Sequence, residues 1–164
     1  MFRILLTILL ILLAPVTFAK KEVFTMKGDV PTGTRIAPDV VTSAIPLDKP
    51  YSELSEEQQA HVKQNYQSMP AGDTPPFPKE GLESIYQPFV DVVSATSKGG
   101  QITAVASIDK HGKAQKVAIY RTTGDTMTKA IYAVLMGAEF DPAICDGEPC
   151  AMDYLLDLHT EYKL

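Results

Sequence analysis

The sequence lacks the positive charge that a nucleic-acid-binding surface needs. It contains 15 Lys and Arg against 20 Asp and Glu, which gives a formal net charge of −5 at pH 7, and it has no stretch of clustered basic residues. Proteins hold the phosphate backbone mainly through Lys and Arg. A mildly acidic chain therefore has no electrostatic basis for binding nucleic acid, and we expect no such partner.

Motifs for catalysis and cofactor binding are also missing. The sequence has no Gly-x-Ser-x-Gly elbow, no glycine-rich phosphate loop and no His-Glu-x-x-His pair. Its three histidines, His61, His111 and His159, stand about fifty residues apart, so no local spacing of metal ligands is present. Carboxylates such as Asp153 and Asp157 are typical of a solvated strand face. The sequence predicts a protein with no catalytic residues, metal or cofactor.

Long hydrophobic runs are scarce, and the one at the N-terminus is short. Arg3 precedes an apolar run from Ile4 to Ala14, Pro15 breaks it, and small residues lead to Ala19. This layout is typical of a secretory signal peptide. The alternative is an uncleaved membrane anchor, but about 16 residues fall short of the ~20 that a spanning helix needs. We expect cleavage after Ala19, no lipid anchor, and an oxidising destination such as the periplasm.

The mature chain is expected to begin with two segments that precede the main domain. Residues 20–50 contain four prolines and show no helical or alternating pattern, which predicts an extended arm, loosely ordered or laid on the domain surface. Residues 51–81 are expected to form a short polar helix over 55–69 and a proline-rich linker. Ser55 followed by Gln58 fits a capping box at the start of this helix.

Residues 82–164 have the apolar density of a folded domain. A helix is expected to start at Pro88, because proline is tolerated in the first turn and not in a helix interior. The runs 101–108 and 113–121 both alternate between apolar and polar residues and flank an Asp-Lys-His-Gly turn, which indicates a β-hairpin.

The rest of this domain reads as a second helix and a last strand. Apolar residues at helical spacing follow Asp125 as far as Gly137, and the final run alternates so that Tyr154, Leu156 and Leu158 share one face. We expect an α+β fold with the order helix–strand–strand–helix–strand, in which two helices pack in two layers on a three-stranded antiparallel sheet. Without tryptophan the core is modest.

Three stretches of this domain resemble the TonB C-terminal domain family. ITAVASIDKHGKAQKVAIYRTTGD is similar to the first hairpin of the family, Phe140-Asp141-Pro142-Ala143 to its Phe-x-Pro-Ala signature, and CDGEPCAMDYLLDL to its last turn and strand. The likeness covers about residues 88–160. It implies a module that binds an extended peptide, such as the TonB box of an outer-membrane receptor, beside the last strand by strand addition.

The peptide-binding edge that this resemblance implies is the last strand, Ala151 to Thr160. Its outward residues Asp153, Leu155, Asp157 and His159 are the candidates for partner selection; the alternative is an ordinary solvated strand face. The N-terminal apolar segment has only one polar residue and no long proline-rich spacer follows it, unlike the energy-transmitting members of the family. The chain therefore resembles a secreted, stand-alone version of the domain.

The only two cysteines, Cys145 and Cys150, flank the last turn of this alignment. If Cys150 opens the last strand, the pair can reach disulfide distance. One alternative is a redox-active pair, but such pairs usually have two intervening residues and lie at a helix N-terminus. The other alternative is a zinc site, which requires a second pair of ligands.

Two functions follow. The first is a periplasmic binding or adaptor module associated with TonB-type envelope transport. The second is a non-catalytic structural or inhibitor protein, in which residues 20–50 and 55–69 fold back over the sheet edge. A homodimer is a further alternative.

Overall fold

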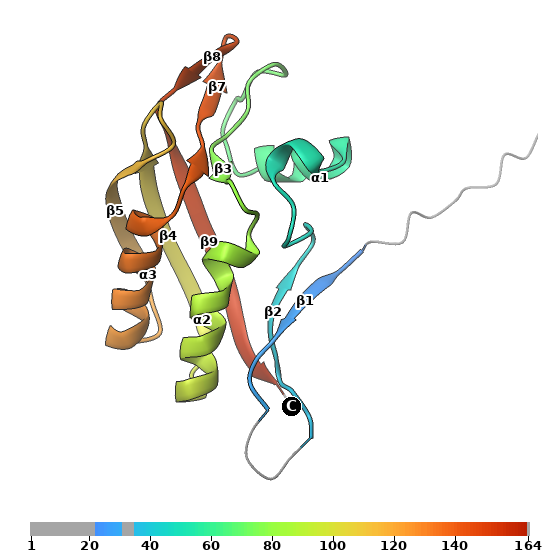
Figure 1. The fold of residues 1–164 in the computed structure, drawn as a ribbon, viewed down its shortest axis with the longest axis vertical. Helices are drawn as coiled ribbons and strands as arrows, with labels where there is room; N and C mark the ends of the chain where they lie inside the picture. The colour runs from blue at the N-terminus through green and yellow to red at the C-terminus, as the bar shows by residue number, and fades with distance from the viewer. Residues whose placement is uncertain (1–21, 31–34, 164) are drawn as a thin grey trace, which may run out of the picture.

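The computed structural model describes residues 22–30 and 35–163, and the expected signal peptide (residues 1–19) lies outside them. The described chain is an α+β fold with an antiparallel five-stranded sheet in the order β1-β2-β9-β4-β5 (Figure 1). The strands of this sheet are β1 (Phe24–Lys27), β2 (Asp39–Ser43), β4 (Gly100–Ile108), β5 (Ala114–Arg121) and β9 (Met152–Lys163). The helices are α1 (Glu56–Lys63), α2 (Glu83–Thr96) and α3 (Asp125–Gly137).

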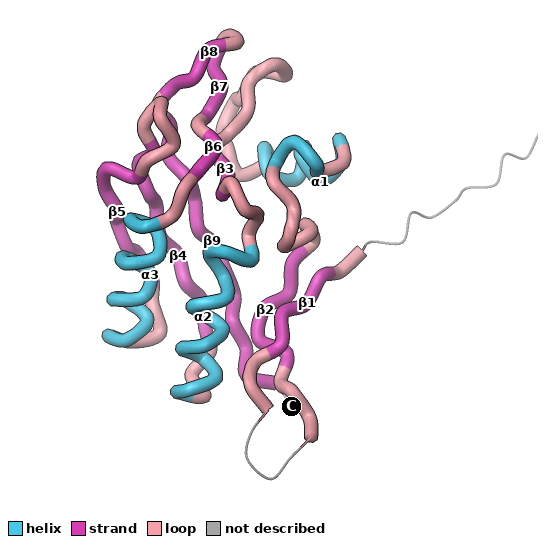
Figure 2. The backbone as a smooth tube through the Cα atoms, in the orientation of Figure 1, coloured by secondary structure: helices cyan, strands magenta, loops and turns pink. Residues whose placement is uncertain are grey.

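Short elements complete the architecture (Figure 2). A 3₁₀ turn (Tyr51–Glu53) precedes α1, β3 (Phe77–Pro78) pairs with β6 (Phe140–Asp141), and β7 (Ala143–Cys145) pairs with β8 (Glu148–Cys150). Helices α2 and α3 pack against each other and lie on the same side of the sheet, α3 over β4 and β5 and α2 over β9, β2 and β1 (Figure 1).

The predicted β4–β5 hairpin is confirmed. The four apolar residues on one face of β4 are fully buried: Ile102, Ala104, Ala106 and Ile108. At the turn, Asp109 Oδ1 accepts hydrogen bonds from the backbone N–H groups of His111 (2.8 Å) and Lys113 (3.0 Å). Gly112 has a φ of +77°, and a Cβ added there would collide with the carbonyl oxygen of Phe140. The turn therefore requires glycine.

Helix α3 is also as predicted in its extent and its inward face. Met127, Ile131 and Leu135 are buried on the side that faces the sheet. The helix ends at Gly137 without the left-handed residue that a glycine stop usually supplies, because Ala138 follows in an extended conformation.

The expected start of the first domain helix at Pro88 is wrong. Helix α2 begins at Glu83, five residues earlier, and Pro88 lies inside it. The additional turn buries Ile85 and Tyr86 beside Phe89. Burial of two large side chains contributes roughly 1.5–3 kcal/mol each. This gain offsets the ~3 kcal/mol that an interior proline costs.

The N-terminal arm is not a loosely ordered segment but part of the sheet, so the expected three strands are five. β1 and β2 form a hairpin in the arm, and β2 pairs with the end of β9 through Asp39 with Lys163 and Val41 with Thr160. Val40 and Val41 are 2% and 1% exposed. The arm also contacts α2, where the backbone N–H of Asp29 donates to Ser94 Oγ at 3.2 Å.

Helix α1 has the predicted capping box but is shorter than expected. Ser55 accepts from the backbone of Gln58, and the Gln58 side chain accepts from the backbone of Ser55. The helix ends at Lys63 instead of continuing to residue 69. The linker after it runs beside β7, where Thr74 exchanges two backbone hydrogen bonds of 3.0 Å with Ile144.

The two cysteines form a disulfide, as expected. Cys145 and Cys150 have Cα atoms 5.8 Å apart and close the β7–β8 hairpin, whose turn residues Asp146 and Gly147 both have positive φ. Cys150 ends β8 instead of opening the last strand, which begins at Met152. Among the described residues, no helix is long and apolar enough to cross a bilayer.

Candidate peptide-binding edge

The last strand has one fully paired side and one partly paired side. Towards β4, the pairing runs from Met152 opposite Ile108 to Thr160 opposite Gly100. On the other side, β2 pairs only near Thr160 and Lys163. The outer side of residues 152–159 therefore pairs with no other strand in the described part of the chain. We call this stretch the β9 edge.

The four residues predicted to select a partner all lie on the open face of β9, away from the helices. Asp153, Asp157 and His159 are exposed and Leu155 is half-buried, whereas the residues between them are buried. Strand alternation therefore places Tyr154, Leu156 and Leu158 on the helix-covered side. The structure thus brings the four together in one row, as predicted.

Two of these four side chains already have partners within the protein. Asp157 Oδ1 accepts hydrogen bonds from Gln101 Nε2 (2.6 Å) and Thr103 Oγ1 (3.0 Å) on β4. His159 Nε2 lies 3.2 Å from Glu161 Oε1. The contacts of Asp157 join β9 to β4 and stabilise the sheet surface by themselves, whereas the His159–Glu161 contact lies within β9. Asp153 and Leu155 have more freedom to contact a partner through their side chains.

Tyr66, in the segment after α1, partly covers the β9 edge. Burial raises the pKa of its hydroxyl to about 12, opposed by a hydrogen bond from the backbone of Leu155 and reinforced by the nearby carboxylate of Asp153. The phenol therefore stays neutral and occupies a backbone group that an added strand would use. Tyr66 falls within the range 55–69 that was expected to be helical, and the sequence gave no signal for this contact.

A recess opens beside Tyr66, with a volume of about 70 Å³, and Ile45 and Phe77 are among the residues that line it. Its walls include Leu155 and Asp157 of β9, Tyr86 of α2 and Tyr154. Burial raises the pKa of Tyr86 to about 12, with a smaller contribution from the Asp157 carboxylate. Burial likewise raises the pKa of Tyr154, and the neighbouring Tyr86 and Tyr66 hydroxyls add to that shift.

The size of the recess limits what the β9 edge can accept in this conformation. Ligand pockets for drug-sized molecules usually span ~300–1,000 Å³. A recess of about 70 Å³ has room for one small side chain. A longer extended segment along Met152–His159 requires the Tyr66 side chain to move.

Comparison with known proteins leaves the assignment of a family open. No protein-family model matches the chain, and no curated protein matches it. The resemblance to the TonB C-terminal domain therefore remains a hypothesis based on the motifs and their order.

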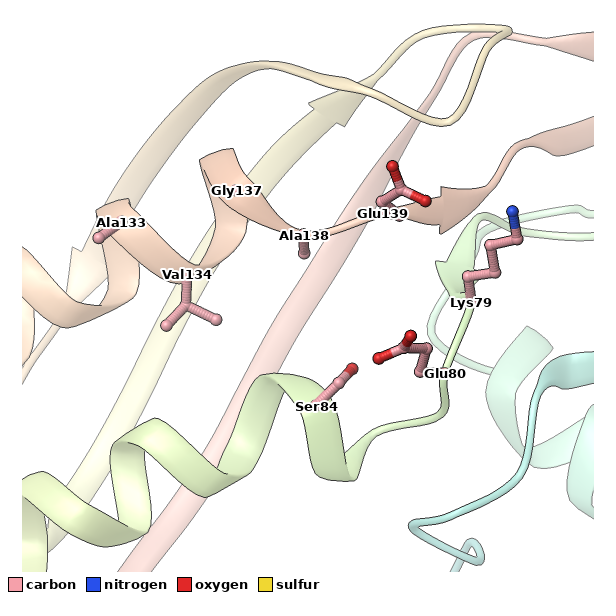
Figure 3. Close-up of a pocket in the computed structure, with 8 residues that line it drawn as sticks. All are labelled: Lys79, Glu80, Ser84, Ala133, Val134, Gly137, Ala138 and Glu139. Atoms are coloured by element: carbon pink, nitrogen blue, oxygen red, sulfur yellow. The ribbon is translucent and has the colours of Figure 1, made fainter.

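A larger cleft lies between the N-terminal end of α2 and the C-terminal end of α3 (Figure 3). It measures about 660 Å³; Val134 of α3 and Ala138, just after α3, project into it, while Ser84 and Glu80 approach from the other side. Its polar groups are partly engaged, since Ser84 Oγ donates to the carbonyl of Gly81 at 2.8 Å. The cleft thus offers an apolar floor with few convergent polar groups.

Charged side chains gather at the rim of this cleft. Lys113 Nζ lies 2.6 Å from Glu139 Oε1. That hydrogen bond and the charges of Lys113 and Lys79 lower the pKa of the Glu139 carboxyl. The ion pair ties the start of β5 to the segment that follows α3.

The three histidines do not converge. His61 lies on α1, His111 in the β4–β5 turn and His159 on β9. Within the described residues, no group of three or more His, Cys, Asp or Glu side chains is placed to hold a metal ion.

Proposed function

We propose that this protein is a non-catalytic binding module of the cell envelope, with the two-layer architecture of the TonB C-terminal type, which holds an extended peptide by strand addition. The observation that carries the proposal is the β9 edge: eight residues of a long strand, paired fully with β4 on one side and with no other described strand on the other side. Unpaired backbone N–H and C=O groups are the requirement for adding a strand.

The disulfide and the N-terminal sequence support an envelope location. A disulfide between the only two cysteines suits an oxidising compartment such as the periplasm. The proposed signal peptide would deliver the chain there. Association with a TonB-type transport system is the corresponding biological setting.

A second function, as a scaffold or inhibitor with a closed edge, is favoured by one specific observation. β2 already pairs with β9 at Thr160 and Lys163, and Tyr66 reaches the backbone of Leu155. If these contacts are permanent, the arm and the segment after α1 take the place of a partner strand. The two proposals differ in whether Tyr66 moves.

Titration of the ¹⁵N-labelled mature protein with TonB-box peptides tests the choice. We expect amide shifts confined to residues 153–159, and tighter binding by Tyr66→Ala, in which the covering side chain is removed. Tyr66→Phe is the matched control because it keeps the ring and loses only the hydroxyl. If neither the wild type nor Tyr66→Ala shows shifts along β9, the peptide-binding proposal for this edge is wrong and the scaffold proposal remains.

A further inference from the structure

The outer side of β5 is a second free strand edge in the described part of the chain. β5 is the last strand of the sheet, and its eight residues pair with β4 on one side only. It lies at the left rim in Figure 1, with α3 in front of it. Just before its start, Lys113 forms a bridge with Glu139, and this is the one backbone bridge at this edge among the described residues. At ~3.3 Å per residue the edge is about 26 Å long.

The middle of this edge is apolar. Val117, Ala118 and Ile119 are all half-buried, and Tyr120 is 73% exposed. On the adjacent helix α3, Tyr132 is 53% exposed. Exposed tyrosines are typical of binding surfaces, because a large rigid ring gains contact area at a small entropic cost. A strand placed against β5 would cover part of this apolar surface.

The two ends of the apolar stretch are basic. Lys116 and Arg121 are exposed, and neither forms an ion pair with another described residue. Residues 113–121 contain no acidic residue, in a chain whose net charge is −5. Lys113 is neutralised by Glu139, so Lys116 and Arg121 are the charges that remain for a partner.

We propose that the outer edge of β5 binds an extended acidic segment of a partner protein as a sixth strand. The partner segment carries two acidic residues four positions apart, opposite Lys116 and Arg121, with β-branched or aromatic residues between them, because the bulge at Tyr120 adds one residue to β5. Charge pairs directly across two strands stabilise the pairing, and the apolar middle supplies the contact area. A β-bulge at Tyr120 places Lys116, opposite Ser107, and Arg121, opposite Thr103, on the same face of the sheet. Two acidic residues four positions apart on a regular strand also share one face.

The charges disfavour a second copy of this chain as the occupant. When β5 pairs antiparallel with β5 of another copy over the whole KVAIYR stretch, Lys116 of one chain lies opposite Arg121 of the other at both ends. Like charges directly opposite each other destabilise strand pairing. The two basic residues thus select against self-association while they favour an acidic guest.

This inference goes beyond the proposed function, because it concerns a different edge and a different partner chemistry. The probe is a fluorescent peptide, acetyl-Ser-Thr-Glu-Val-Thr-Val-Glu-Thr-Ser-amide, and its twin with both Glu replaced by Lys. We expect the Glu peptide to bind the mature protein more tightly at low salt than at high salt, and at least tenfold more tightly than the Lys peptide. Amide exchange should slow at alternate residues of 115–121.

Charge reversal supplies the matched test. Lys116→Glu with Arg121→Glu should weaken binding of the Glu peptide about tenfold and make the Lys peptide the better ligand. Lys49→Glu with Lys98→Glu is the control, since both side chains are exposed and lie outside β5 and it makes the same change in net charge. The control should bind the Glu peptide with less than about a threefold loss, through long-range charge alone.

Three outcomes would overturn the inference: equal binding of the two peptides to the wild type, protection at residues 153–159 instead of 115–121, or concentration-dependent dimerisation through β5 in sedimentation. Equal binding would leave Lys116 and Arg121 as residues that merely guard an exposed strand against aggregation. Dimerisation would show instead that the β5 edge pairs with a second copy of the chain despite these charges. TonB-box shifts at the β9 edge combined with no acidic-peptide binding would refute the β5 inference and keep the proposed function. Binding of the acidic peptide at β5, without binding of any TonB-box peptide at the β9 edge, would support the β5 inference and refute the proposed function.

Discussion

The three strands β9, β4 and β5 have two outer flanks, and the protein treats them differently. The β9 flank is closed at one end by β2 and covered near Leu155 by Tyr66. The β5 flank is open along most of its length and carries Lys116 and Arg121. The backbone hydrogen-bonding groups of the β9 flank are therefore satisfied within the chain at one end and near Leu155, whereas those of the β5 flank are left available along most of its length.

This difference teaches that edge strands can be protected in two ways in one sheet. The β9 side uses additional chain, which buries apolar residues and closes the end of the edge at Thr160 and Lys163. The β5 side uses charge, which blocks like-charged strands but permits an oppositely charged one. The distinction can be tested. Burial of β2, ionisation of Tyr86 and the disulfide contribute to the stability of the β9 flank, whereas the turn at Asp109 contributes to that of the β5 flank.

The largest effect is expected where additional chain closes the β9 flank. Val40→Ala with Val41→Ala should lower the free energy of unfolding by about 4 kcal/mol, because each substitution removes two buried methyl groups and leaves a cavity. Urea unfolding at neutral pH measures this loss. Amide exchange at Thr160–Lys163 should also accelerate, since β2 no longer packs against the end of β9.

The matched control removes the same groups from the open flank. Val105→Ala with Val117→Ala affects two half-buried residues of β4 and β5 and should cost about 1 kcal/mol per residue or less. Equal losses in the two double variants would mean that β2 contributes no more to the fold than an ordinary surface, and the contrast between the flanks would collapse.

Alkaline pH should destabilise the β9 flank selectively. The pKa of Tyr86 is raised from 10.0 to about 12 by burial. A raised folded-state pKa means that the folded chain holds the proton more tightly, so this stability is fully present below pH 10 and is lost as the pH approaches 12. A two-unit difference corresponds to roughly 3 kcal/mol.

Tyr86→Phe should flatten the decline of unfolding free energy above pH 10, as followed by urea unfolding at a series of pH values. Tyr120→Phe, on exposed β5, should leave the decline unchanged. If the unfolding free energy of both variants declines above pH 10 as it does in the wild type, ionisation of Tyr86 does not control alkaline stability.

The disulfide hairpin that leads into β9 should contribute a smaller amount. Cys145→Ala with Cys150→Ala is expected to cost about 2 kcal/mol, since the closed loop is short and constrains the unfolded chain only moderately. Unfolding of the wild type in a reducing agent should reproduce the value. A reduced wild type as stable as the oxidised form would indicate that the β7–β8 turn and the bridge to Thr74 already fix the start of β9.

The sequence predicted the elements whose pattern is local. The β4–β5 hairpin follows from two alternating runs around Asp109 and Gly112, and α3 from its regular apolar spacing. The disulfide followed from Cys145 and Cys150 flanking one turn in an aligned strand. In each case neighbouring residues contain the required information.

Elements that depend on distant contacts were missed. β2 contains two adjacent buried valines, Val40 and Val41, instead of an alternating pattern, and prolines surround it, so its pairing with β9 cannot be read locally. The start of α2 was misplaced because the general penalty for Pro88 is outweighed by the burial of Ile85 and Tyr86. The row Asp153–His159 was predictable from alternation, but its partial cover by Tyr66 was not.

The smallest effect is expected at the turn that begins the open flank. Hydrogen bonds from the backbone of Lys113 and His111, the His111 charge and the Gln115 side chain together hold the pKa of Asp109 below its ordinary value of 3.8. A lowered folded-state pKa contributes stability that is present above pH 3.8 and is lost as the pH falls through the folded-state value. Acid should therefore loosen the start of β5, whereas alkali acts on the β9 side.

Asp109→Asn should weaken the pH dependence of unfolding below about pH 4, because an amide cannot lose a proton and accepts weaker hydrogen bonds from the same backbone groups. Amide exchange at residues 111–115 should rise in the variant at neutral pH, while exchange at Thr160–Lys163 stays as in the wild type. Asp48→Asn, at an exposed position away from β5, is the control. The β5 edge can accept a strand only if β5 itself stays paired with β4. Asp109→Asn should therefore also lower the affinity of the protein for the acidic peptide. An unchanged affinity would show that the guest pairs only with the end of β5 near Arg121.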